Sequence, residues 1–286
     1  IGILVVDITR EFFSEILKGI HDELNKRGYK LILFDTENKN EKEREYILKY
    51  KDIVSGFIIA PCTGNQNHAY YGSLIVEKIP FVFIDRYLSE FNVDVVTSDN
   101  KNGGYEATKH LIELGHKNIC VLAEPESTSL EGRIEGYKEA IEEAHLKLNE
   151  KYIFYGEKRG YENGYLLTKN IIKNYSEITS FFCSNDDVAW GCLNALSEEG
   201  IKVPEEISIV GFDNLAFTEK LNPPLTTINQ KKYEMGQKSA ELLIKKIEGI
   251  KTKGMEEIRL PCELVIRNST CKVKTIPKTY IGEIGR

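Results

Sequence analysis

The strongest constraint on the fold is an alternation of short apolar runs with segments of helical spacing, which occurs twice along the 286 residues. Within residues 12–27, for example, apolar side chains recur every three or four positions, as they do along one face of an amphipathic helix. Short apolar runs typical of buried strands lie at residues 3–6, 29–34, 56–60, 80–84 and 93–97. Parallel strands joined by helices form sheets that are covered on both faces. The pattern therefore predicts an α/β fold built from doubly wound parallel sheets.

The pattern begins again near Asp99, which is a good N-cap for a helix over about residues 103–114. Further strands are predicted at residues 119–123, 152–155, 180–183, 207–212 and 259–266, with an extended crossing at 225–230 and a helix at 233–248. Two such runs predict two similar lobes, joined by a hinge of about three crossings. We assign residues 1–98 and about 229–257 to the N-terminal lobe, residues 99–228 and about 258–273 to the C-terminal lobe, and residues 274–286 to a C-terminal tail. A cleft between two lobes is a favoured place for a ligand.

Composition limits the environment and the partners of the chain. Hydrophobic residues make up 41% and charged residues 29%, as in soluble globular proteins. No apolar run approaches the ~20 residues that a membrane span needs, and the sequence opens on a strand without an export signal. We therefore expect a cytoplasmic protein with no membrane partner. A net charge of −6 without a dense basic cluster disfavours DNA binding by these residues themselves.

Patterns typical of enzymes and metal proteins do not occur in the sequence. The six cysteines and five histidines are scattered, without a CxxC motif or a cluster at metal-ligand spacing. A GxSxG nucleophile motif does not occur, and Gly103 and Gly104 belong to neither common phosphate-binding motif. Adjacent Asp186 and Asp187 are expected to serve a helix N-terminus rather than acid–base chemistry. We predict no catalytic residues, no metal and no cofactor.

Candidate binding residues follow the predicted strands, where open α/β sheets bind their ligands. These loops contain carboxylates, amides, arginines and aromatic rings, and they cover residues 8–13, 85–86, 127–133, 185–186 and 213–214. Such a mixture suits polyhydroxylated ligands, because carboxylates and amides bind hydroxyls while aromatic rings cover the apolar face of a sugar. An ordinary helix cap or surface ion pair explains any single one of these residues equally well. Several loops that converge on one cleft favour a binding site.

Five segments together resemble a known family. The segment VPEEISIVGFDN at 203–214 combines a buried strand with Gly211, which allows close approach of the backbone, and with Asp213, which otherwise would cap the next turn. The other four are ATKHLIELGH at 107–116, RIEGY at 133–137, PPLTTINQ at 223–230 and LPCELVIR at 260–267. In this order they resemble the effector-binding core of the LacI/GalR transcription regulators, from residue 1 to about 270. The resemblance implies a type I periplasmic-binding-protein-like fold.

The resemblance also implies which residues contact the effector. By position these are Phe12, Phe13, Asp85, Arg86, Ser129, Arg133, Asn185, Asp213 and Gln230. Many members place a stacking aromatic near residues 159–161, where this chain has Arg159. Either Tyr161 takes over the stacking role, or the ligand is more polar or anionic than usual. Both Arg159 and Tyr161 are therefore candidate ligand contacts.

Members of this family are homodimeric repressors whose effector alters lobe closure, an allosteric change that reaches operator DNA through an N-terminal DNA-binding domain. That domain is absent from this chain, and either a helix-turn-helix or a winged-helix head would fit. The implied partners are a small-molecule effector, with a carbohydrate preferred, operator DNA, and a second copy of the chain. A sugar-binding protein of a transport system shares the fold and is the alternative, and a sugar-processing enzyme is a distant third.

Overall fold

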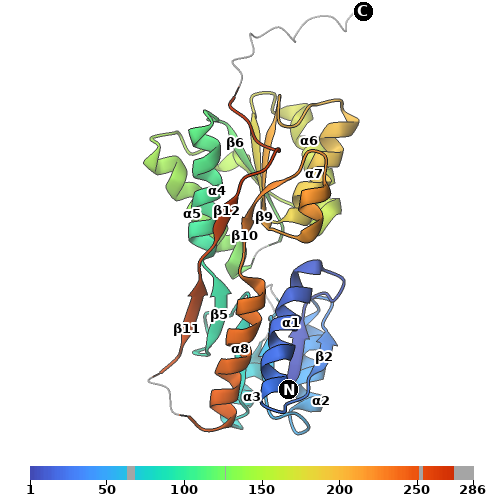
Figure 1. Ribbon diagram of the computed structural model, residues 1–286, viewed down its shortest axis with the longest axis vertical. Helices are drawn as coiled ribbons and strands as arrows, with labels where there is room; N and C mark the ends of the chain where they lie inside the picture. Colours follow the sequence, from blue (N-terminus) through green and yellow to red (C-terminus); the bar gives the residue numbers. More distant parts are fainter. Residues whose placement is uncertain (63–67, 126, 251–253, 274–286) are drawn as a thin grey trace, which may run out of the picture.

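The computed structural model describes residues 1–62, 68–125, 127–250 and 254–273, and it forms two lobes stacked along the long axis of the molecule (Figure 1). Each lobe is built on one six-stranded sheet with helices on both faces. This confirms the predicted architecture of two doubly wound lobes. The predicted tail, residues 274–286, lies outside the described residues.

The N-terminal sheet has the strand order β11-β5-β4-β3-β1-β2, and all of its strand pairs are parallel. Its strands are β1 (Gly2–Val5), β2 (Ile32–Asp35), β3 (Phe57–Ile59), β4 (Phe81–Ile84), β5 (Val95–Ser98) and β11 (Glu257–Leu260). The helices of this lobe are α1 (Glu11–Lys26), α2 (Asn40–Tyr50), α3 (Ala69–Val76) and α8 (Lys232–Ile247). One apolar core lies between the sheet and the α1–α8 pair, and a second, rich in aromatic rings, lies under α2 and α3.

The C-terminal sheet has the order β12-β10-β9-β8-β6-β7, and it is parallel except for its edge strand β12. Its strands are β6 (Ile119–Ala123), β7 (Ile153–Tyr155), β8 (Ser180–Cys183), β9 (Ser208–Asp213), β10 (Thr226–Asn229) and β12 (Glu263–Val265). The helices are α4 (Asn100–Glu113), α5 (Thr128–Glu143), α6 (Gly160–Asn174) and α7 (Asp186–Glu198), with short 3-10 turns η1 (Glu150–Tyr152) and η2 (Ala216–Lys220). Again an apolar core covers each face of the sheet.

The chain passes between the two sheets three times, after β5, after β10 and after β11. One boundary from the sequence needs correction. Residues 259–266 were predicted as one strand, with residues from about 258 in the C-terminal lobe, but β11 pairs with β5 in the first sheet and only β12 joins the second. Pro261 lies between them and has no N–H for a ladder, so one continuous strand is interrupted there.

Three pairs of helices that lie side by side pack so closely that their backbones touch. In each of the pairs α1–α8, α4–α5 and α6–α7, a glycine on each helix lies against the backbone of the other. A Cβ atom at Gly164 on α6 would lie 1.9 Å from the carbonyl oxygen of Val188, and one at Gly191 on α7 would lie 2.0 Å from that of Tyr161. The rotation of each helix about its axis is therefore set by its neighbour. Among the described residues, the helices are too short or too polar to cross a bilayer.

Candidate ligand-binding site

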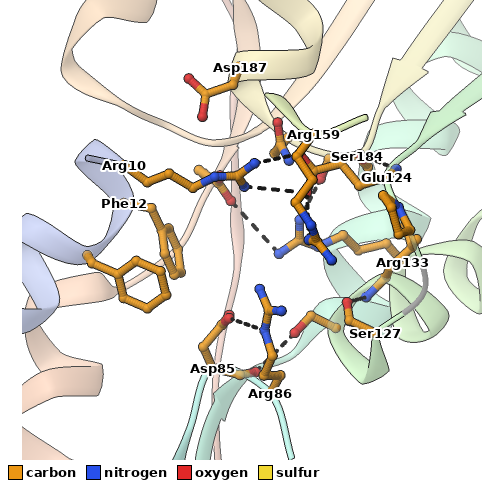
Figure 2. Close-up of a pocket in the computed structure, with 16 residues that line it drawn as sticks. Arg10, Phe12, Asp85, Arg86, Glu124, Ser127, Arg133, Arg159, Ser184 and Asp187 are labelled. Carbon is orange, nitrogen blue, oxygen red and sulfur yellow. Dashed lines mark hydrogen bonds and ion pairs between the residues drawn. The ribbon is translucent and has the colours of Figure 1, made fainter. Parts of the chain in front are cut away.

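A polar pocket lies between the two lobes, at the carboxyl ends of β1 and β4 from one lobe and of β6, β8 and β9 from the other (Figure 2). The N-terminal lobe contributes Arg10, Phe12, Phe13, Asp85 and Arg86. The C-terminal lobe contributes Glu124, Pro125, Ser127, Ser129, Leu130, Arg133, Arg159, Ser184, Asn185, Asp187 and Asp213. The cavity volume open to the centres of water-sized molecules is about 50 Å³. The lobes are therefore close together in this structure.

Nine of the eleven residues expected from the sequence line this pocket. They are Phe12, Phe13, Asp85, Arg86, Ser129, Arg133, Arg159, Asn185 and Asp213. The structure thus brings them to one place, while their contacts with a ligand stay predictions.

The other two expected residues lie elsewhere. Tyr161 is 37% exposed, its hydroxyl accepts a hydrogen bond from Asn194 Nδ2 (2.9 Å), and its ring meets Trp190 edge-on. It therefore lies against α7 and does not supply an aromatic face to the pocket. Gln230 lies behind the pocket wall, where its Nε2 donates to Asp213 Oδ1 and its Oε1 accepts from Ser98 Oγ, both at 2.6 Å. It can orient Asp213 without touching a ligand.

Glu124 is the most informative residue that the sequence argument missed. Its carboxylate accepts hydrogen bonds from Arg10 Nη2 (2.8 Å) and Nη1 (3.4 Å), and from the backbone N–H of Gly160 at the start of α6. Burial alone would raise the pKa of this carboxyl, but Arg10, the Gly160 N–H and Arg159 lower it to about 2. Glu124 directly follows β6, so the same rule that found Asp85 and Asp213 would have found it.

The Arg10–Glu124 ion pair joins the two lobes across the pocket. Other bonds also cross the cleft: Ser129 Oγ donates to the carbonyl of Asp85 (3.1 Å), and the Ala216 N–H donates to Glu11 Oε1 (2.8 Å). These contacts connect the two lobes in the arrangement that the structure shows.

Arg133 is fixed in place by contacts on several sides. Its Nε donates to Asn100 Oδ1 (2.9 Å), its Nη1 donates to the carbonyl of Ser184, and its guanidinium lies 3.8 Å from the ring centroid of Phe212. Its Nη2 lies 3.8 Å from Asp213 Oδ1. Burial raises the pKa of Asp213 to about 7, against the opposing effects of Arg133 and Lys232. A carboxyl that is half ionised near neutral pH can both accept and donate to a ligand hydroxyl.

Two neighbouring residues after β8, Asn185 and Asp186, make different structural contacts. Asn185 Oδ1 caps α7 by accepting from the Val188 N–H (2.9 Å). Asp186 was expected to serve the same helix start, but it is fully buried and accepts from Leu215 N (2.8 Å) and Thr227 Oγ1 (2.6 Å). A Cβ atom on Gly211 would lie 2.3 Å from Asp186 Oδ1, which is the close approach that this glycine allows. Asp186 therefore ties the β8 loop to β9 and β10 beneath the pocket.

In the described part of the chain, no group of three or more His, Cys, Asp or Glu side chains is placed to hold a metal ion. The polar side chains of the pocket can form hydrogen bonds with a ligand, and its aromatic rings can stack on one. Carboxylates, guanidiniums and an amide surround a small space that Phe12 borders on one side (Figure 2), and Phe13 also lines it. This geometry defines a ligand-binding domain of the two-lobe, periplasmic-binding-protein type.

Comparison with known proteins agrees with this class and narrows it. Residues 108–270 match the periplasmic binding protein-like domain family. The HTH-type transcriptional repressor PurR of Histophilus somni is 34% identical over 96% of this chain and 82% of its own length, and the HTH-type transcriptional regulator DegA of Bacillus subtilis is 35% identical with the same coverage. The crystal structure of a LacI family transcriptional regulator from Enterococcus faecium with bound ribose superposes with a TM-score of 0.83 at 35% identity, covering 96% of this chain and 99% of that one.

The chain belongs to the LacI family of transcription regulators. It is a ligand-sensing regulator domain, and its relatives are named as regulators and repressors, which confirms the prediction that it is not an enzyme.

Proposed function

We propose that the cleft binds a small sugar or sugar-like effector of a bacterial repressor. The observation that carries this proposal is the convergence of Asp85 and Asp213, from opposite lobes, on one pocket that also contains Arg133 and the rings of Phe12 and Phe13. The aspartates and the arginine suit hydroxyl groups, and the rings suit the apolar face of a sugar. The ribose bound to the relative from E. faecium supports a ligand of this class.

The small size of the cavity argues against a ligand longer than a monosaccharide. A volume of about 50 Å³ for water-sized centres corresponds to roughly four water positions. A longer saccharide would keep the lobes apart and would break bonds such as Ser129–Asp85 that now cross the cleft.

We further propose that closure of the lobes is coupled to operator DNA. In a homodimer, the distance between the two DNA-binding domains depends on the angle between lobes, so an effector that prefers the closed state changes DNA affinity. The coupling is only as large as the difference between the effector's affinities for the two states. Such a regulator acts in the cytoplasm.

An exposed aromatic patch on the C-terminal lobe supports the homodimer. Trp190 on α7 is 40% exposed and contacts Tyr161 of α6 and Phe217 of η2, with ring centroids 5.1 and 5.4 Å away. Aromatic side chains are enriched in protein–protein interfaces. Sedimentation of the purified domain measures its oligomeric state directly.

Binding of sugars to the purified chain tests the main proposal. A thermal-shift panel of pentoses, hexoses, disaccharides, sugar phosphates and nucleobases should yield one class that stabilises the fold, by ~2.7 kcal/mol at a hundred times its Kd. Asp213→Ala should abolish the shift, because it removes a hydroxyl partner and leaves Arg133 poorly paired. The control Asp52→Ala makes the same change at an exposed position and should leave the shift intact. A panel without any stabilising sugar, or an unaltered shift in Asp213→Ala, would refute the proposal.

A further inference from the structure

Four guanidinium groups face the one small pocket, and two of them are fully engaged by the protein. Arg133 contacts Asn100, Ser184, Phe212 and Asp213, as described above. Arg10 makes two hydrogen bonds with Glu124. Arg86 and Arg159 are therefore the two arginines whose N–H groups are available to bind a ligand.

Arg86 is buried with donor capacity unused. Its side chain rises into the pocket from β4 (Figure 2), only 8% of the residue is exposed, and its Nε lies 3.3 Å from Asp85 Oδ2. Its Nη1 is buried and has no hydrogen-bond partner among the described residues. Unpaired buried donors are rare and costly in folded proteins, above all on a charged group. An acceptor on the ligand would complete this guanidinium.

Arg159 enters the same pocket from the start of α6 and shares its carboxylate with another arginine. Its Nη1 lies 3.6 Å from Glu124 Oε2, the oxygen that also accepts from Arg10 Nη1. Its side chain remains 28% exposed. Burial, together with the charges of Arg86 and Arg10, lowers the pKa of Arg159, although Glu124 opposes the change. Arg86 and Arg10 are therefore close enough to Arg159 to repel its charge.

Fewer carboxylates than arginines lie in the part of the pocket that contains Arg10, Arg86 and Arg159. Glu124 and Asp85 face the three arginines, and Asp187 lies at the opposite edge of the pocket from Arg86 in Figure 2. Burial raises the pKa of Asp213 to about 7, and burial also raises the pKa of Asp187. Tyr161 points away, so no aromatic ring from the start of α6 covers the space in front of Arg159.

We propose that the effector carries an anionic group, a carboxylate or a phosphate, which Arg86 and Arg159 bind together. The proposal rests on the sugar-binding function proposed above and specifies its ligand as a sugar acid or a sugar phosphate. Guanidinium groups bind both kinds of anion through paired, charge-assisted N–H donors, and these bonds are stronger than those that the same groups donate to a neutral hydroxyl.

Calorimetric titration with matched ligands tests it. The pairs are glucose with glucuronate and with glucose 6-phosphate, galactose with galacturonate, and ribose with ribose 5-phosphate. In at least one pair the anionic member should bind tenfold or more tightly than the neutral one, and the acid and phosphate arms tell the two sources apart. Neutral sugars that bind as tightly as all their anionic partners would overturn this inference and leave the proposed function standing. Silence from every ligand would remove the proposed function itself.

The variant Arg159→Gln tests the assignment to this side chain. Loss of a charge-assisted bond should weaken the anionic ligand about ten- to a hundredfold, while the neutral partner of the pair stays within about twofold. The control Lys158→Gln removes the same charge one residue earlier, where the side chain is exposed and outside the pocket. The melting temperatures of both variants without ligand report whether they fold. If Arg159→Gln keeps the full anionic preference, or if Lys158→Gln loses as much, Arg159 is not the anion ligand.

The variant Arg86→Lys keeps the charge but loses the paired donors. It should weaken binding of the anionic ligand less than Arg159→Gln does.

Discussion

At the scale of single residues, two of the aspartates that line the cleft have backbone conformations that residues other than glycine rarely adopt. Asp213, at the end of β9, has φ +118°, and Asp85, just after β4, has φ +66°. Positive φ costs free energy in residues other than glycine, and such strain gathers at functional sites. Both aspartates lie at the carboxyl end of a strand that borders the pocket, so their position in the site follows from their place at a strand end.

Burial of Asp213 predicts an unusual dependence of stability on pH. Its folded pKa is raised to about 7, against about 3.9 in an unfolded chain. Between these values the folded protein holds a proton that the unfolded chain has lost, so stability falls as pH rises. The free energy of unfolding of the wild type, relative to Asp213→Asn, should fall by about 2.5 kcal/mol from pH 5 to pH 8. Urea unfolding at several pH values measures it. A difference that stays constant with pH would mean that Arg133 keeps the carboxylate ionised.

Sequence reasoning located the pocket well because carboxyl ends of parallel strands converge, whatever the details of packing. It failed where side-chain direction depends on distant contacts. Arg159 faces the cleft while Tyr161, two residues later, faces α7. Which of them faces the ligand is decided by the rotation of α6, and that rotation is set by the contacts of Gly164 and Gly191 with the opposite helix. No local pattern encodes it.

At the scale of elements, the reciprocal glycines let neighbouring helices touch backbone to backbone. The same arrangement recurs in α1–α8 with Gly19 and Gly236, and in α4–α5 with Gly104 and Gly136. The last predicted strand, residues 259–266, shows what the sequence pattern does not predict at this scale, which is the sheet that a strand joins. One apolar run proved to be two strands in different sheets, because sheet membership depends on partners and not on the run itself.

Substitution of one of these glycines should destabilise the fold without touching the pocket. Gly164→Ala places a methyl group 1.9 Å from the Val188 carbonyl oxygen, and overpacking of this kind costs about 1–3 kcal/mol. Gly72 lies within α3 with no described atom within 4 Å of its Cβ position, so Gly72→Ala should be neutral or stabilise by about 0.5–1 kcal/mol. Denaturant unfolding compares the two. Equal effects would show that α6 and α7 can separate without loss.

At the scale of the whole molecule, the lobes are held together by the chain's own contacts as well as by any ligand. The partly buried Arg10–Glu124 pair is the only ion pair described between the pocket walls of the two lobes, and Ser129–Asp85 and Ala216–Glu11 add bonds between them. A ligand therefore adds to contacts that the closed arrangement already makes. The stronger these contacts are, the smaller the further change that an effector can cause.

Removal of the ion pair should therefore shift the free domain toward an open state. Arg10→Ala removes the partner of Glu124 from the other lobe and leaves only the partners within its own lobe, Gly160 and Arg159. A charge-assisted bond is worth about 1.5–3 kcal/mol, so the ratio of closed to open molecules should fall about tenfold or more. Small-angle scattering should record a larger radius of gyration without ligand and a return to the wild-type value with it. Arg27→Ala, which breaks a pair with Glu248 inside one lobe, should change neither. An Arg10→Ala radius equal to that of the wild type in both states would place the closure energy in the hinge crossings, and the effector would then act on the crossings rather than on the pocket walls.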